Sequence, residues 1–298
     1  MPKPRQRMRD ASFPEKWMDL APDIPYPKKD WIKQKWLDVS YGGHPKQKLD
    51  VYHPNANNHR LERYPLMIIL HGGGFTHMDK ADWDVYPGFF WLEKGYAVAS
   101  VNYRLAPKHK FPAGVEDCYA AARYLIERAD EYLIDKRNLF IMGPSAGGSL
   151  TLITGLRLYN GQEGADYRIK ALAPLCPVTD LSSGFGSINV AFSKVLLWYM
   201  LRSYLGKSPK KGVTAPFDAS FYLKETIPPI FFQLGRLDPV ITVDYIETFA
   251  KKLKGKGEVV IDILEEGYHM GATKHFFLDE NILRYLDFFE SKIEAAAV

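Results

Sequence analysis

The sequence has few cysteines, no long apolar run and no large excess of charge of one sign. Cys118 and Cys176 are the only cysteines among 298 residues, too few for the disulfide framework of a small secreted protein, so we expect both to be buried, reduced thiols. No segment approaches the roughly 18 apolar residues of a membrane-spanning helix. The basic N-terminus is not followed by the apolar core of a signal peptide. We therefore expect a cytoplasmic protein without a membrane span.

The charge balance argues against nucleic-acid binding. The 39 Lys and Arg residues nearly match the 35 Asp and Glu residues, which leaves a net charge of +4. The basic clusters are short and no aromatic-interleaved basic face accompanies them, so they are typical of a solvated surface rather than of a nucleic-acid interface. The hydrophobic share of 46% is ample for a sizeable core.

Apolar segments alternate with segments of helical periodicity along most of the chain. A hairpin, Lys35–Ser40 with Lys48–Tyr52 around a glycine turn, is followed by apolar runs that we expect to be strands: 66–70, 96–102, 139–142, 169–175, 229–234 and 259–264. This alternation predicts one α/β domain over residues 1–298, with a mostly parallel sheet of about eight strands and helices on both faces. The ligand site is then expected at the carboxyl ends of the strands. The strand 259–264 is expected at a sheet edge, where a homodimer could form.

Two segments depart from this alternation. Residues 1–35 form an N-terminal arm rich in Pro and charge, and residues 181–217 interrupt the rhythm with an aromatic-rich helical segment between two loops. An insertion between two strands of such a sheet is most simply a lid or the wall of a pocket. The alternative is a regular crossover helix.

The segment 138–151 reads strand, G-x-S-x-G, helix. Gly143, Ala146, Gly147 and Gly148 surround Ser145, and only small residues can flank a serine on so tight a turn between strand and helix. Such a nucleophile elbow exposes the hydroxyl above the sheet, beside the first N–H groups of the helix. The structural alternative, without catalysis, is a glycine-rich turn with a capping serine.

A serine nucleophile needs a general base and a carboxylate to hold that base. Of the eight histidines, His269 follows the strand 259–264 between two glycines, and His275 is its nearest competitor. Asp238 follows the strand 229–234, although an ordinary Asp-Pro turn would also place an aspartate there. Asp244 has the simpler interpretation of an early-helix carboxylate, and Asp180 that of a cap for the insertion that it precedes. The order Ser145, Asp238, His269 is that of the α/β-hydrolase version of the triad.

The sequence HGGGF at 71–75 follows the strand 66–70 directly. Consecutive glycines let backbone N–H groups point toward a developing oxyanion, and we expect the hole to consist of the amides of Gly73, Gly74 and Ala146. His71 is expected to brace this loop. Phe75, Trp198 and Tyr199 are candidates to line a substrate pocket, with core packing as the alternative for each.

Five motifs in order, HGGGF at 71–75, YRLAPKHKFPAGVED at 103–117, GPSAGG at 143–148, GRLDPV at 235–240 and YHMGA at 268–272, resemble those of the carboxylesterases of the hormone-sensitive-lipase type. The resemblance implies the α/β-hydrolase fold, Ser145 as nucleophile, His269 as base and Asp238 as the orienting acid. It also implies no metal or organic cofactor and a preference for short acyl esters. The chain departs from that family at Pro144, where Asp or Thr is usual.

We therefore interpret the chain as a serine carboxylesterase for a small-molecule ester. Compact acetyl- and feruloyl-esterases share the layout, which makes plant polysaccharide esters an alternative class of substrate. An amide-cleaving, arylformamidase-like hydrolase of the same fold is a second alternative. A non-catalytic receptor, or an interaction protein with a vestigial pocket, is a third.

Overall fold

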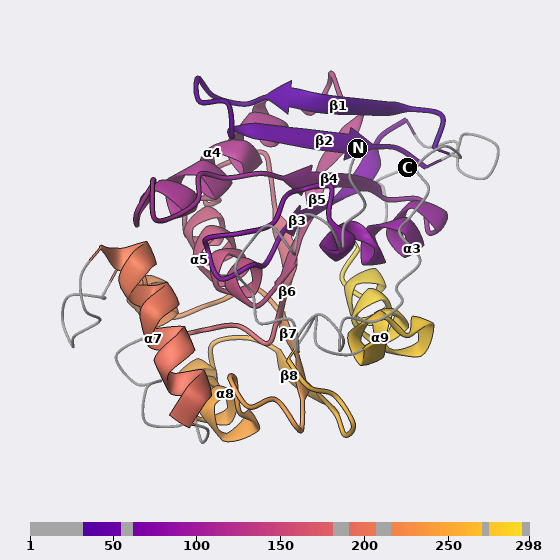
Figure 1. Cartoon of the computed structure of the whole chain (residues 1–298). Coiled ribbons are helices and arrows are strands. Elements are labelled where there is room, and N and C mark those ends of the chain that lie inside the picture. The colour runs from indigo at the N-terminus through magenta and orange to yellow at the C-terminus, as the bar shows by residue number, and fades with distance from the viewer. Residues whose placement is uncertain (1–31, 55–61, 181–190, 207–215, 270–273, 294–298) are drawn as a thin grey trace.

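An eight-stranded sheet organises the chain, seen in the computed structural model in Figure 1. The structure describes residues 32–54, 62–180, 191–206, 216–269 and 274–293. The strand order is β1-β2-β4-β3-β5-β6-β7-β8. The strands are β1 (Lys35–Ser40), β2 (Lys48–Tyr52), β3 (Tyr64–Leu70), β4 (Ala97–Val101), β5 (Ile134–Pro144), β6 (Ile169–Leu175), β7 (Ile230–Gly235) and β8 (Val259–Leu264).

The sheet is antiparallel only where β2 pairs with β1 and with β4, and all its other pairings are parallel. The prediction of a mostly parallel sheet of about eight strands with an initial hairpin is therefore confirmed. Strands β3 and β4 are almost entirely buried apolar runs, as expected of parallel strands covered on both faces.

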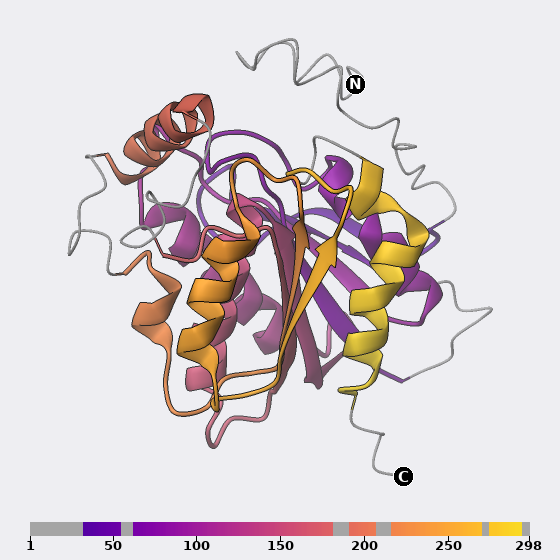
Figure 2. The same cartoon turned by 90° about the horizontal axis from the view of Figure 1, so that it is seen from below.

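Helices cover both faces of the sheet, as predicted. In Figure 2, α4, α5 and α8 lie on one side of the strands and α3 and α9 on the other. The helices are α3 (Pro87–Glu93), α4 (Ala113–Glu127), α5 (Ala146–Asn160), α7 (Ala191–Leu205), α8 (Val243–Ala250) and α9 (Asp279–Glu290), with short 3-10 turns at Trp83–Val85, Ala219–Tyr222, Lys251–Leu253 and Lys274–Phe277. The Trp91 ring of α3 is fully buried and lies 5.0 Å from the Phe289 ring of α9, which joins the two helices of the second layer.

Strand β5 is longer than the apolar pattern predicts. We expected residues 139–142, but β5 begins at Ile134 and runs to Pro144. Its early residues pair with Tyr64 and Pro65 of β3, and the register shifts before Leu66 pairs with Leu139. The extra residues are largely polar and only partly buried, so backbone pairing rather than an apolar run makes them a strand.

The insertion contains the helix that we predicted there, α7. Residues 181–190 and 207–215 of the insertion, and residues 1–31 of the predicted N-terminal arm, lie outside the described residues. Figure 2 shows α7 at the end of the molecule toward which the arrowheads of β7 and β8 point. The Tyr204 ring of α7 stacks on Phe75 at 4.1 Å and lies 5.7 Å from Phe217. Aromatic packing of this kind fixes the C-terminal end of α7 against the loop after β3.

Strand β8 ends the strand order and is an edge strand, as predicted. Its pairing with a second copy of the chain stays a prediction. Among the described residues, no helix combines the length and apolar character that crossing a membrane requires.

Among the glycines of the described residues, the closest approach to backbone atoms is between the first turn of α5 and the end of β3. A Cβ atom added to Gly147 would lie 1.9 Å from the carbonyl oxygen of Leu70 and 2.6 Å from that of His71. A Cβ at Gly143 would lie 2.3 Å from the same Leu70 oxygen. Backbone atoms cannot move aside as the end of a flexible side chain can, so glycine is required at both positions.

We expect Gly147→Ala to lower the free energy of unfolding by about 3 kcal/mol or more, because the added methyl group forces α5 away from β3. Gly43→Ala is the matched control, because a Cβ at Gly43 meets nothing within 4 Å; its effect should stay within about 0.5 kcal/mol. Urea denaturation of both variants measures the two values. Equal stabilities would contradict the steric argument.

Candidate active site

Ser145 occupies the turn between β5 and α5. Its backbone angles, φ 53° and ψ −117°, lie outside the regions that a serine prefers. Its amide donates to the Leu175 carbonyl of β6 at 2.8 Å, and its own carbonyl accepts from the Ser149 amide at 3.1 Å. The strained conformation is thus fixed by the neighbouring strand on one side and by the helix on the other.

The structure brings Ser145, His269 and Asp238 together, although 124 residues separate the first two. The Ser145 hydroxyl oxygen lies 2.9 Å from His269 Nε2, and His269 Nδ1 lies 2.7 Å from Asp238 Oδ2. The side chain of Asp238 is fully buried, whereas that of His269 is 15% exposed. The other carboxylate oxygen, Oδ1, accepts from the amides of Val240 at 2.7 Å and Ile241 at 2.9 Å. These backbone donors fix the carboxylate, and the carboxylate fixes the ring.

Two opposing effects act on the pKa of His269. Burial lowers it, whereas the charge of Asp238 and the contact with the Cys176 sulfur raise it. The charge effects prevail, so the pKa of the imidazole lies well above its ordinary value. The His269 ring therefore takes up a proton readily, and the positive charge that it then carries faces Asp238.

The HGGGF loop leaves the end of β3 beside the Ser145 turn. Gly73 and Gly74 have φ of 87° and 59°, in the left-handed region that glycine adopts without strain. The Gly73 carbonyl accepts from the amides of Thr76 at 3.1 Å and His77 at 3.0 Å, which closes a tight turn. Within the described chain, the amides of Gly73, Gly74 and Ala146 donate to no protein acceptor. These are the three amides predicted from the sequence as oxyanion donors.

Buried side chains hold this loop from behind. The Tyr103 hydroxyl donates to the carbonyl of His71 at 2.8 Å, and Asp84 Oδ2 accepts from the Gly72 amide at 2.7 Å. The imidazole of His71 stacks on Tyr103 at 4.3 Å. Burial lowers the pKa of His71 to about 4, so its ring is neutral near pH 7. His71 is part of the loop's packing, as predicted.

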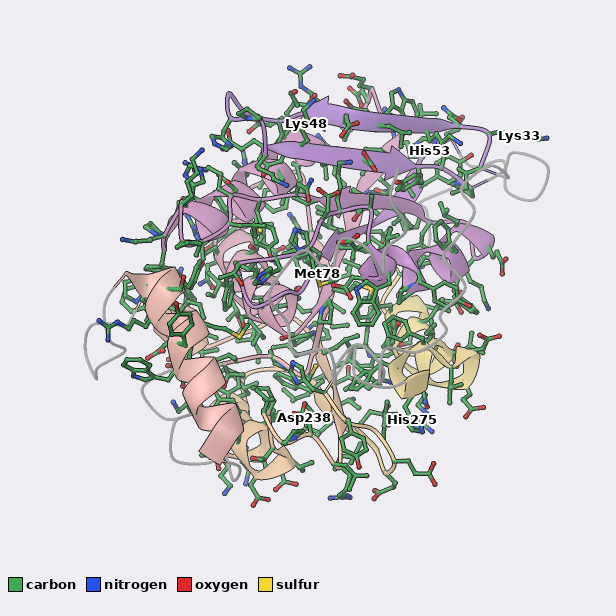
Figure 3. The ribbon with its side chains drawn as sticks, in the orientation of Figure 1. Lys33, Lys48, His53, Met78, Asp238 and His275 are labelled. Carbon is green, nitrogen blue, oxygen red and sulfur yellow. The ribbon has the colours of Figure 1, made fainter. Side chains whose placement is uncertain are left out.

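The competing residues have other partners. His275 Nε2 lies 3.5 Å from Glu266, and Figure 3 shows His275 beside α9, away from Asp238. Asp180 is buried, pairs with Lys252, and accepts from the Ser220 amide at 3.1 Å. Asp244 lies in the first turn of α8, which is the helix-terminal position that its sequence context predicted.

We did not identify Cys176, Asp84 or Tyr103 from the sequence as residues that contact the candidate site. Cys176 comes directly after β6, in a buried position with φ 38°. Its sulfur, a carboxylate oxygen of Asp238 and a ring nitrogen of His269 all lie within 4.8 Å of one another. Asp238 was identified by its position after the carboxyl end of a strand. Cys176 occupies the same kind of position after β6, so Cys176 could have been identified as a site residue by the same argument. The three groups are of the kinds that bind zinc, although Asp238 and His269 already hydrogen-bond to each other.

The family model BD-FAE matches residues 49–253. Esterase LipQ of Mycobacterium tuberculosis is 27% identical over 252 residues, which cover 82% of this chain and 58% of LipQ. Ethyl acetate hydrolase of Pseudomonas putida is 32% identical over 155 residues, which cover 50% of this chain and 48% of the hydrolase. The chain thus spans about half to three fifths of the length of these curated relatives.

Solved structures share the fold. A truncated carbohydrate esterase from gut microbiota superposes with a TM-score of 0.76 at 20% identity, covering 89% of this chain and 98% of that one. Esterase B from Lactobacillus rhamnosis superposes with a TM-score of 0.71 at 21% identity, covering 87% of this chain and 85% of the other. The sheet therefore has the α/β-hydrolase arrangement.

We expect Asp84 to make the stability of the protein depend on pH. Burial raises the pKa of its carboxyl from 3.8 to about 7, partly offset by the Gly72 amide. Between these values the unfolded chain releases the proton and the folded chain keeps it, so stability falls as pH rises from about 4 to 7.

The isosteric variant Asp84→Asn lacks this titration. Compared with the wild type, it should gain stability between pH 4 and 8, on the order of 1.4 kcal/mol for each unit by which folding raises the pKa. Guanidinium denaturation of both proteins at pH 4, 6 and 8 gives the difference at each pH. A difference that does not change with pH would contradict the assignment to Asp84.

Proposed function

Because the chain belongs to the BD-FAE family, in the hormone-sensitive-lipase type of esterase, we propose that it is a serine carboxylesterase that hydrolyses short-chain acyl esters. The observation that carries the proposal is the continuous hydrogen-bonded series from Ser145 through His269 to the buried Asp238. A serine hydroxyl is a poor nucleophile alone, and this series supplies the base that it needs.

In the proposed mechanism, Ser145 attacks the ester carbonyl while His269 Nε2 accepts the hydroxyl proton. Asp238 accepts from Nδ1–H, which keeps Nε2 free of a proton before attack and stabilises the imidazolium afterwards. His269 then gives its proton to the departing alcohol and leaves an acyl group on Ser145. A water molecule, deprotonated by His269, attacks the acyl group and releases the acid.

The oxyanion of each tetrahedral intermediate is proposed to accept from the amides of Gly73, Gly74 and Ala146. No group of the described residues accepts from these amides, which supports this role, because such donors need no rearrangement when the charge develops. Asp84 and Tyr103 support it indirectly by fixing the adjacent groups of His71 and Gly72. Loss of one donor typically reduces the rate by about 10²–10³.

We propose that α7 is the lid of this site. A Cβ atom at Gly74 would lie 1.6 Å from the terminal methyl carbon of Met200, so α7 places a side chain directly on the loop of the oxyanion donors. Trp198 and Tyr199 belong to the same helix, and Tyr199 is 69% exposed. Phe75 is fully packed against Tyr204, which favours a structural role for its ring.

Carbohydrate esters are a second class of candidate substrate. They are suggested by the name of the truncated carbohydrate esterase from gut microbiota that shares the fold. The two classes are compared directly by measuring the hydrolysis rates of nitrophenyl esters of increasing acyl length, acetylated xylan and methyl ferulate. N-formylkynurenine, included in the same series, tests the amide-cleaving alternative.

We expect Ser145→Ala to abolish p-nitrophenyl acetate hydrolysis, a loss of roughly 10⁴-fold or more, without unfolding the protein. His269→Ala should cause a comparable loss, whereas the matched variant His275→Ala should retain activity. Steady-state kinetics and circular dichroism of the three variants measure both effects.

Covalent labelling by a fluorophosphonate should occur in the wild type and disappear in Ser145→Ala. Turnover retained by Ser145→Ala, or labelling at another residue, would refute the proposed nucleophile. The labelling also separates an enzyme from a receptor that only binds its ligand.

A further inference from the structure

We propose that Cys176, Asp238 and His269 form an inhibitory site for a soft divalent cation, with Zn²⁺ as the best fit. The inference rests on the proposed function, because the cation would act on the catalytic base. Its three candidate ligand atoms, a thiol sulfur, a carboxylate oxygen and an imidazole nitrogen, lie within 4.8 Å of one another. Sulfur and imidazole ligands favour zinc over magnesium or calcium.

The backbone already places the ligands on neighbouring supports. Cys176 directly follows β6, and its amide donates to the Gln233 carbonyl of the adjacent β7 at 2.9 Å. Asp238 follows β7 after a short turn. Zinc bonds of about 2.3 Å to sulfur and 2.0–2.1 Å to nitrogen and oxygen bring tetrahedral ligands to roughly 3.3–3.6 Å from one another. The His269–Asp238 pair, at 2.7 Å, would therefore open by about 0.6 Å, and the sulfur would need to lie about 3.6 Å from the ring nitrogen.

The charges of the ligands favour binding of the ion at this buried position once the thiol is deprotonated. A thiolate and a carboxylate together neutralise one Zn²⁺, so the buried complex carries no net charge. Cys176 and the Asp238 side chain are fully buried. Of the three side chains, the 15% exposed ring of His269 is the one that solvent reaches.

The bound ion would switch off the base by changing its tautomer. The Cys176 thiol releases its proton to solvent when the sulfur binds the metal. Zinc at Nδ1 displaces the proton that Nδ1 donates to Asp238, and the ring then carries its proton on Nε2. A protonated Nε2 cannot accept from the Ser145 hydroxyl, so inhibition follows without oxidation or covalent modification. Starting from the neutral ring that the proposed base requires, one proton leaves the protein for each ion bound.

The first experiment measures p-nitrophenyl acetate hydrolysis by the full chain with increasing ZnCl₂, each variant normalised to its own rate without metal. We expect inhibition of the wild type that EDTA reverses, and a rise of roughly tenfold or more in the inhibition constant for Cys176→Ala. Cys176→Ser keeps the size of the side chain and should also weaken inhibition. Cys118→Ser is the matched control, since Cys118 is also a buried free thiol, and should be inhibited like the wild type.

The second experiment needs no esterase activity. Co²⁺ added to Ser145→Ala should produce a thiolate-to-cobalt charge-transfer band, and the double variant Ser145→Ala/Cys176→Ser should lack it. If this band appears while the wild type hydrolyses no ester, the metal site stands and the proposed function fails. Equal zinc inhibition of the wild type and Cys176→Ala, or a cobalt spectrum without the band, would overturn the metal site whatever the activity.

Discussion

The near-contact between the first turn of α5 and the end of β3 is the constraint on which the site depends. Only hydrogen atoms at Gly147 allow the helix to approach the Leu70 carbonyl so closely. This approach places the Ala146 amide beside the HGGGF loop and leaves Ser145 on a strained turn above the sheet. Ser145, the proposed nucleophile, and the proposed oxyanion donors thus owe their common location to one packing requirement rather than to separate ones.

Hydrogen bonds from backbone amides to buried carboxylates hold two parts of the site in place. Asp238 accepts from two amides of its own loop, and Asp84 accepts from the Gly72 amide. The two carboxyls have different consequences. Asp238 acts on the pKa of His269 through its charge, whereas burial raises the pKa of Asp84 itself to about 7. Holding the loop in this way therefore has a cost in stability at neutral pH, as is common for functional sites.

Cys176 places a thiol beside His269, the proposed base, in addition to the carboxylate of Asp238. Its sulfur lies within 4.8 Å of a ring nitrogen of His269, whose proposed role as base depends on which nitrogen carries the proton. The hydrogen-bonded carboxylate of Asp238 favours the tautomer that the proposed mechanism needs, and a cation at the proposed metal site would reverse it. The same buried position that shields the Asp238 side chain from solvent also shields the thiol.

Much of the fold and of the site can be predicted from the sequence alone, because periodicity and glycine placement are local properties. The hairpin, the apolar strands and the G-x-S-x-G turn are examples. The positions of Ser145, Asp238 and His269 after predicted strands made them candidate site residues. The beginning of β5 could not be predicted in this way, since partly exposed polar residues become a strand only by pairing with β3. Nor could the positions of Asp84, Tyr103 and Cys176 beside the site, because their contacts join segments that the sequence keeps apart. Sequence thus decides which residues can adopt each local conformation, and tertiary packing decides which of their side chains meet, because burial, charge and hydrogen bonding act through space.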